Sequence, residues 1–471
     1  MAPVMNTQNL MYAAGGVAGA LVLWYIISND GKRHPPTVPF DLKRLAILKE
    51  RKLSIQTHED HKKLGPVLRF SFLGVDQYFV ADAQACQRIL AGPAQEFYRD
   101  DTLQNAFSGI AKMLLFAIPA GDQWARHRKL LSPSFSQIQV LHAFGETIKA
   151  VNTLLDIWKS HPRGTIVNLH YDFSMMALDV VGYTAEGKDS DGYHMVEKLS
   201  DKVMYRMVVP RFLWRFIGLE NSSIADGSAY IREMITKVLE AKNASTTIKP
   251  DRQMDVLDRL LAKTDSGEAR FTQEEVVDEI VGFYAAGHET TANTLTFCFA
   301  AMLLNPETKA KLVAEIDYVL RGAPPTYQDL GKLKYMDNFI SEVQRFYAVV
   351  FMIPRRSRVD TELCGYHIPK NSLVLVNVFS THRGSWNWGD DAEVFDPSRF
   401  DRPVPGGAFI PFGAGNMMCI GQRTALAEVK ASMVVLLQNM DFELMPGQDF
   451  DPIIGVTQGL KKGLMVKTSP L

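Results

Sequence analysis

Residues 412–421 read Phe-Gly-Ala-Gly-Asn-Met-Met-Cys-Ile-Gly, and this loop around Cys419 decides how the rest of the chain is interpreted. A thiolate that binds a haem iron needs backbone N–H groups that point at the sulfur and hold its charge. Gly415 allows the sharp turn that such a loop makes. Phe412 supplies a flat apolar side chain beside the sulfur, and Gly421 leaves room where the next helix passes the porphyrin. The loop therefore predicts a thiolate ligand, with a glycine-rich turn around a buried cysteine as the alternative.

The composition is that of an ordinary globular protein. Of the 471 residues, 46% are hydrophobic and 22% are charged, so a large core is available. The formal net charge of -1 gives nucleic-acid binding no electrostatic support. The remaining cysteines form no CxxC pair, which argues against a zinc site or a disulfide framework; they are Cys86, Cys298 and Cys364.

The N-terminal segment differs from the rest of the chain because residues 1–29 carry no charged side chain. Residues 10–28 are almost entirely apolar, close to the roughly 20 residues that span a bilayer as a helix. Lys32 and Arg33 follow at once and mark the cytosolic side. A cleaved signal peptide is the competing interpretation, although its charge usually precedes the apolar run. We therefore predict a membrane anchor at 1–29, a proline-containing hinge at 30–40 and a catalytic domain at 41–471.

Apolar periodicity predicts that most of this domain is helical. The clearest helix starts after Thr272, which forms a capping box with Glu275, and it ends at Asn305-Pro306. Residues 67–72 and 77–80 form a candidate strand pair, and short strands return beyond residue 350. The whole reads as one large domain, mainly α with small β-sheets, that ends in a hairpin around Gly459.

At the Cys419 loop the sequence resembles the haem-binding signature of the cytochrome P450 family, Phe-x-x-Gly-x-Arg/His-x-Cys-x-Gly. It departs from the pattern where Met417 replaces the basic residue, because a thioether cannot neutralise a haem propionate. The resemblance covers nearly the whole chain and implies the cytochrome P450 fold, haem b (iron protoporphyrin IX) as cofactor, and Cys419 as the iron ligand.

Three further motifs occur in the family's order. Trp124 and Arg128 match a Trp-x-x-x-Arg helix whose end residues bind a propionate, and Arg355 matches another propionate-binding position. The resemblance also implies a buried structural network behind the haem, formed by Glu342, Arg345 and Arg399. Taken alone, such pairs are common on solvated helix faces.

Residues 286–291, Ala-Gly-His-Glu-Thr-Thr, place polar groups inside the long apolar helix. Polar side chains there are unfavourable without partners. Thr290 can bond a carbonyl one turn back, and we expect a widened turn at this point. A packing notch with a paired Glu289 is the alternative. The resemblance implies that Glu289 and Thr290 are catalytic and deliver protons to iron-bound dioxygen, while the thiolate favours O–O cleavage.

The resemblance further implies a monooxygenase, an oxidoreductase acting on paired donors that inserts one atom of O2 into a lipophilic substrate. The expected substrate pocket contains Phe107, Phe283, Ala286, Val350, Phe351, Val456 and Thr457. The chain has no Gly-x-Gly-x-x-Gly segment after a strand, so its electrons are expected from an NADPH-dependent flavoprotein reductase. The expected location is the endoplasmic reticulum membrane, single-pass, with the catalytic domain in the cytosol. Two alternatives are a haem-thiolate isomerase or dehydratase of peroxides, and a non-catalytic haem- or lipid-binding membrane protein.

Overall fold

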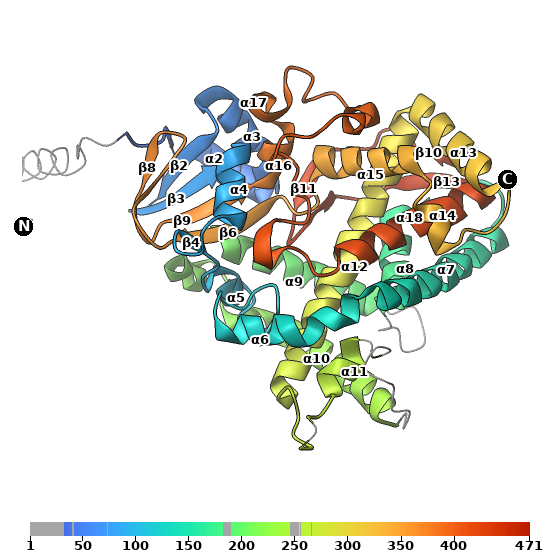
Figure 1. Ribbon diagram of the computed structural model, residues 1–471, viewed down its shortest axis with the longest axis horizontal. Helices are drawn as coiled ribbons and strands as arrows, with labels where there is room; N and C mark the ends of the chain where they lie inside the picture. Colours follow the sequence, from blue (N-terminus) through green and yellow to red (C-terminus); the bar gives the residue numbers. More distant parts are fainter. Residues whose placement is uncertain are drawn as a thin grey trace, which may run out of the picture.

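Helices form most of the fold, and the described strands make four small sheets (Figure 1). The computed structural model describes residues 33–39, 42–72, 74–181, 190–244, 254, 256–264 and 266–471. The predicted anchor at 1–29 lies outside these residues. Within them, no helix is both long and apolar enough to cross a bilayer. The prediction of a mainly helical fold with small sheets is confirmed.

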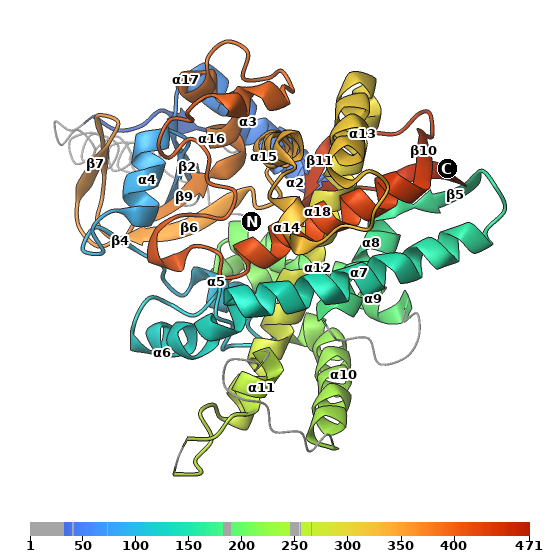
Figure 2. The same ribbon diagram turned by 45° about the vertical axis from the view of Figure 1, so that its right-hand side comes forward.

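The helix α12 (Gln273–Leu304) runs through the middle of the molecule in both views (Figures 1 and 2). Its 32 residues span about 48 Å at 1.5 Å per residue. The predicted capping box is present, since the Thr272 hydroxyl accepts from the Glu275 N–H and the Glu275 carboxylate accepts from the Thr272 N–H. Residues 291–302 are buried all round, which explains why this helix is apolar on every face.

Three helices pack against α12: α8 (Leu169–Val181), α15 (Lys334–Tyr347) and α18 (Gln422–Asn439). The helix α7 (Gln137–Ser160) packs against α8 and α18 and completes the core. The other α-helices are α2 (Leu42–Lys49), α3 (Leu53–Leu64), α4 (Ala83–Ala91), α5 (Thr102–Ala106), α6 (Asp122–Leu131), α9 (Ser190–Val208), α10 (Ala225–Ala244), α11 (Val256–Leu261), α13 (Pro306–Leu320), α14 (Tyr327–Leu330), α16 (Val378–Arg383) and α17 (Ser385–Trp388). Short 3-10 helices are η1 (Ser132–Phe135), η2 (Arg211–Phe216), η3 (Asn221–Ile224), η5 (Pro397–Asp401) and η6 (Gly415–Met417).

The largest sheet has the strand order β1-β2-β3-β9-β6-β4. Its strands are β1 (Thr37–Val38), β2 (Val67–Phe72), β3 (Val75–Val80), β9 (Leu373–Asn377), β6 (Met352–Ser357) and β4 (Phe97–Tyr98). The predicted strand pair is thus present as the antiparallel hairpin β2–β3, with Phe72 opposite Val75. β1 pairs with β2 in parallel, so the folded domain already begins within the segment that we predicted as a hinge.

Three smaller sheets complete the fold. One has the order β10 (Met440–Leu444), β13 (Met465–Pro470), β5 (Thr165–Asn168), and a hairpin joins β7 (Thr361–Leu363) to β8 (Tyr366–Ile368). The last is the hairpin of β11 (Pro452–Ile454) and β12 (Gln458–Leu460). We predicted a hairpin around Gly459, but its turn lies at residues 455–457, because Gly459 pairs with Ile453 inside the ladder.

Candidate functional site

A cavity of about 950 Å³ lies between the middle of α12 and the loop that contains Cys419. Its volume is at the upper end of the range found for sites that bind small molecules. Most predicted site residues line it: Trp124, Arg128, Thr290, Arg355, Phe412, Cys419 and Gly421. All seven predicted pocket residues do so too: Phe107, Phe283, Ala286, Val350, Phe351, Val456 and Thr457. Trp124 and Cys419, about 300 positions apart in the sequence, therefore meet at one cavity.

The Cys419 loop is held in shape by its own backbone. The Cys419 N–H donates to the Phe412 carbonyl oxygen at 2.9 Å, and the Met418 N–H donates to the Gly415 carbonyl oxygen at 3.1 Å. Burial raises the pKa of the Cys419 thiol, while N–H groups of Gly421 and Gln422 and the charge of Arg128 act to lower it. A bound metal ion would deprotonate such a thiol. The loop therefore provides the donors that a thiolate ligand requires.

Gly415 does not line the cavity but shapes the loop from behind. Its φ of 69° lies in the left-handed region that side chains disfavour. A Cβ at this position would lie 2.5 Å from the carbonyl oxygen of Leu90 and 3.0 Å from the Cα of Ala91. Because both are backbone atoms of α4, the loop can approach that helix only with glycine here.

Trp124 and Arg128 reach the cavity from α6, which is fastened to the start of α12 by a buried histidine. His127 is fully buried, and its two ring nitrogens lie 2.6 Å from Glu279 Oε1 and 3.3 Å from Glu275 Oε1. Burial raises the pKa of Glu279. The α6 face that carries Trp124 and Arg128 is thereby fixed relative to α12.

Positive charge gathers at one end of the cavity, where Arg99, Arg128 and Arg355 form no ion pair with a carboxylate of the described residues. The Arg128 guanidinium has no hydrogen bond to any described residue, and that of Arg355 bonds only the Pro354 carbonyl oxygen, at 2.8 Å. Burial lowers the pKa of Arg355 to about 10. Burial and repulsion from these two arginines lower the pKa of Arg99 to about 9. Buried charges of one sign persist only with compensation, so this end of the cavity is built for an anionic ligand.

On α12 the two candidate proton donors face different ways. The Thr290 side chain lines the cavity, and its hydroxyl donates to the Ala286 carbonyl oxygen at 2.7 Å, as the sequence predicts. The helix nevertheless stays α-helical here, so the widened turn that we expected is not seen. Glu289 does not line the cavity; its Oε1 accepts from the Thr457 hydroxyl at 2.7 Å. The structure thus brings Thr290 to the cavity but not Glu289.

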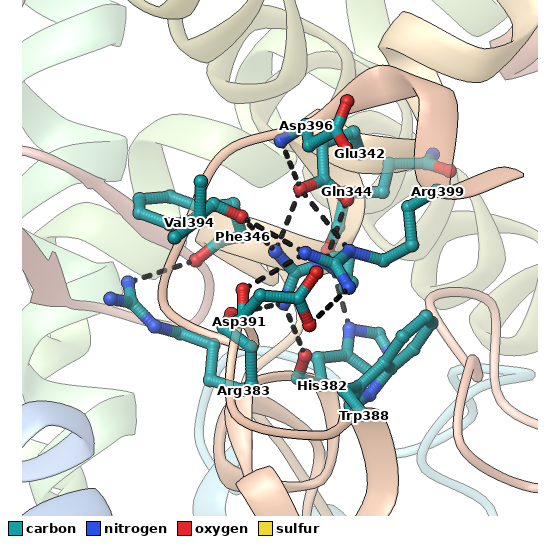
Figure 3. A network of polar contacts seen from close by, with 12 residues as sticks. Glu342, Gln344, Phe346, His382, Arg383, Trp388, Asp391, Val394, Asp396 and Arg399 are labelled. Atoms are coloured by element: carbon teal, nitrogen blue, oxygen red, sulfur yellow. Dashed lines mark hydrogen bonds and ion pairs between the residues drawn. The ribbon is translucent and has the colours of Figure 1, made fainter.

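The Glu342–Arg345–Arg399 network lies outside the cavity, against the loops that precede Phe412 (Figure 3). Glu342 and Arg345 on α15 are fully buried and joined by two hydrogen bonds of 2.6 and 2.7 Å. Arg345 also donates to backbone carbonyls of residues 382, 392 and 394. Arg399 is 3.8 Å from Glu342 and closer, at 3.0 Å, to Asp391. The predicted triad therefore consists of one tight pair and one distant cation.

A buried histidine connects this network with the Cys419 loop. His382 Nε2 accepts from the Ile410 N–H at 2.9 Å. Its Nδ1 lies 3.3 Å from the Gln344 carbonyl oxygen (Figure 3). Burial lowers the pKa of His382 to about 3, which keeps the ring neutral and able to accept. No motif in the sequence pointed to His382.

The family model for cytochrome P450 matches residues 34–470. The chain belongs to the cytochrome P450 family. It is 28% identical to cytochrome P450 734A1 of Arabidopsis thaliana over 71% of this chain and 67% of the relative. It is 27% identical to cytochrome P450 3A13 of Mus musculus over 80% of this chain and 78% of the relative. Members of the family are haem-thiolate monooxygenases, so the cavity is that of a haem-thiolate oxidoreductase.

The residues of this P450 fit a haem. Cys419 would hold the iron through its thiolate, the apolar walls would enclose the ring, and Arg128 and Arg355 are positive groups that two propionates would neutralise. Met417 also lines the cavity in place of the usual basic residue, so these two arginines are the remaining motif cations.

Sequence reasoning missed two charged residues of this P450 site. Arg99 donates to the carbonyl oxygens of Leu115, Phe116 and Ile118, and so holds the cavity wall at 115–118 while it adds positive charge. Glu428 on α18 lines the cavity and accepts from the Thr291 hydroxyl at 3.2 Å. Burial raises the pKa of Glu428 to about 7. Neither residue belongs to a recognisable local pattern, so their burial could not be inferred.

Proposed function

We propose that this P450 is a monooxygenase that inserts one oxygen atom from O2 into a lipophilic organic substrate. The observation that carries the proposal is the position of Cys419, which lines the cavity and whose thiol receives the backbone N–H groups of Gly421 and Gln422. A bound haem b would supply the activation of dioxygen at this place. The chain's own residues hold and orient the cofactor, exclude water and deliver protons.

Each residue has a distinct part in the proposed reaction. Cys419 would ligate the iron of the bound haem, and Trp124, Arg128 and Arg355 would bind its propionates. Thr290 supplies a hydroxyl on the cavity wall, and Glu289 supplies a carboxyl one position earlier on α12. This acid–alcohol pair favours a monooxygenase over an isomerase or dehydratase of peroxides, because only the former must deliver protons to dioxygen.

The substrate is proposed to be lipophilic because the cavity beside Thr290 has an apolar lining. Phe107, Phe116, Phe283, Phe351 and Val456 supply much of it. Such a pocket gains free energy by removing apolar surface from water. It also excludes water from the place where protons are delivered.

Electrons are proposed to come from an NADPH-dependent flavoprotein reductase that docks near α6 and α18. Lys129 and Arg423 are exposed there and are available for an acidic partner. Two other cations of these helices are engaged within the chain. Lys430 is buried and pairs with Asp337, and Arg126 pairs with Glu275.

Attachment to the endoplasmic reticulum membrane, with the catalytic domain in the cytosol, is proposed from residues 1–29. The surface of η2 supports a second contact with lipid, since Phe212 and Phe216 are 53% and 78% exposed beside Arg211 and Arg215. Trp214 of the same segment is buried and belongs to the core instead. Removal of residues 1–29 should move the protein from the membrane pellet to the soluble fraction.

The first experiment is the absorption spectrum of the reduced protein under carbon monoxide. A strongly red-shifted Soret band that is lost in Cys419→Ala supports the thiolate, and a haem spectrum without that shift overturns it. Turnover of lipophilic compounds with reductase and NADPH then separates an enzyme from a non-catalytic haem- or lipid-binding protein. Tight binding without any oxidation would refute the monooxygenase.

A further inference from the structure

Thr457 is the place where the cavity and the Glu289 carboxyl meet. Thr457 lines the cavity from the turn of the β11–β12 hairpin, whereas Glu289 does not line it. Among the described residues, the Glu289 side chain accepts a single hydrogen bond, from the Thr457 hydroxyl at 2.7 Å. A carboxyl that must deliver protons to the cavity is thus separated from it by one hydroxyl group.

The direction of this hydrogen bond follows from the second partner of Thr457. Asn293, one helical turn after Glu289, donates through its Nδ2 to Thr457 Oγ1 at 3.0 Å. A hydroxyl has one proton to donate, and here that proton goes to Glu289 Oε1. Asn293 therefore orients the Thr457 hydroxyl, which in turn holds the carboxyl in one position.

The backbone around Thr457 is held firmly enough to act as a support. The Gln458 N–H donates to the Val349 carbonyl oxygen at 2.8 Å, and the Gln458 amide donates to the Tyr347 and Ala348 carbonyl oxygens. A Cβ on Gly459 would lie 2.5 Å from Asn293 Oδ1, so the hairpin is in close contact with α12. This hairpin joins the end of α15 to the middle of α12, and Thr457 is not a mobile loop residue.

We propose that Thr457 is a positioning residue that holds the Glu289 carboxyl through its hydroxyl and connects that carboxyl with the substrate cavity. The proposal rests on the proposed monooxygenase function. The Thr457 hydroxyl keeps its own proton directed at Glu289 Oε1, so it fixes the position of the carboxyl from which a proton leaves, and solvent water restores the proton that Glu289 loses. Because Thr457 is also part of the cavity wall, a substrate that contacts residues 456–457 lies against the group that directs proton delivery.

Two substitutions separate the hydroxyl from the shape of the side chain. Thr457→Val keeps the size and removes the hydroxyl, and Thr457→Ser keeps the hydroxyl. Thr296→Val is the matched control, because Thr296 is another buried hydroxyl on α12 that bonds only the Ala292 carbonyl oxygen and does not line the cavity. For all three we expect wild-type haem content and the wild-type reduced carbon monoxide spectrum, and for Thr296→Val a substrate dissociation constant within about twofold of wild type.

The first readout is product formed per NADPH consumed. We expect Thr457→Val to lower this ratio about tenfold, a part of the roughly 10²–10⁴-fold that a positioned acid contributes. Thr457→Ser and Thr296→Val should keep it. The second readout needs no turnover: the infrared difference spectrum between wild type and Glu289→Gln isolates the Glu289 carboxyl bands. These bands should shift in the Thr457→Val background and return in Thr457→Ser.

The outcomes distinguish a failure of the proposed monooxygenase function from a failure of the proposed role of Thr457. If the wild-type protein lacks the thiolate spectrum or oxidises no substrate, the proposed function has failed before Thr457 is tested. If the wild type is active and Thr457→Val keeps both its product ratio and its carboxyl bands, Thr457 does not position Glu289. An equal loss in Thr457→Val and Thr296→Val would also overturn the proposal, because it would reflect general damage to α12.

Discussion

The buried pair of Glu342 and Arg345 allows a quantitative test of how the Cys419 loop is supported. In Glu342→Gln the side chain keeps its shape but loses its charge, and its NH2 group meets the donors of Arg345. The two hydrogen bonds of 2.6 and 2.7 Å and the bond from the Asp396 N–H are then weakened or lost. Breaking one partner of a buried ion pair destabilises a protein by about 3–5 kcal/mol.

This free energy converts into a measurable melting shift. Unfolding entropy is about 2.1 cal per mol per K per residue, which gives about 0.9 kcal per mol per K for a domain of roughly 440 residues. We therefore expect Glu342→Gln to lower the melting temperature by about 3–5 °C in calorimetry. Haem should also be lost faster, because Arg345 bonds the His382 carbonyl and His382 holds the Ile410 N–H.

Glu59→Gln is the control, because Glu59 and Lys62 have the same i, i+3 spacing at 2.8 Å but are 43% and 42% exposed. Exposed pairs contribute about 0–1 kcal/mol, so its melting temperature should change by about 1 °C or less. Equal shifts in the two variants would refute the reasoning that burial makes the Glu342–Arg345 pair important.

Three further changes test the loop, the cations and the buried histidine. Gly415→Ala should lower the melting temperature and haem content, because its Cβ meets the Leu90 carbonyl oxygen at 2.5 Å at a φ of 69°, whereas Gly145→Ala in the open interior of α7 should stabilise by about 0.5–1 kcal/mol. Arg355→Gln should speed haem transfer to an acceptor protein about tenfold, as the loss of one charge-assisted bond implies, and exposed Arg358→Gln should not. The pKa of His382 is lowered from 6.5 to about 3, so the unfolded chain binds this proton first and stability falls as the pH drops from about 6.5 toward 3. Between pH 7 and 5 this amounts to about 2 kcal/mol, and urea unfolding of His382→Gln should show a fall smaller by that amount.

Features that depend on neighbouring residues could be predicted from the sequence. The capping box of Thr272 and Glu275 and the bond from Thr290 to Ala286 each involve partners within four residues. The turn at Gly415 is likewise a property of a few consecutive peptide units. In each case the local backbone geometry determines the contact, so the contact can be predicted without knowing how distant parts of the chain fold together.

Features that depend on the chain's path could not be predicted. Glu289 meets Thr457, 168 positions away, and turns from the cavity toward it, which no pattern around residue 289 indicates. Lys430 looks like a surface cation in the sequence, yet it is buried against Asp337 and the Leu330 carbonyl oxygen. Arg399 matches a triad position but lies closer to Asp391 than to Glu342. Motif spacing identifies such residues without identifying their partners.

The surplus of positive charge at the cavity links cofactor binding to the stability of the fold. Arg99, Arg128 and Arg355 repel one another and are partly desolvated, which destabilises the folded chain by itself. The Arg99 guanidinium also donates three hydrogen bonds to backbone carbonyl oxygens of the cavity wall at 115–118. Replacing Arg99 by a neutral residue would therefore remove these bonds together with the charge. An anionic cofactor that neutralises these groups binds only the folded state and therefore stabilises it. We therefore expect the arginines that disfavour the empty fold to strengthen haem retention, even with Met417 in the position of a basic residue.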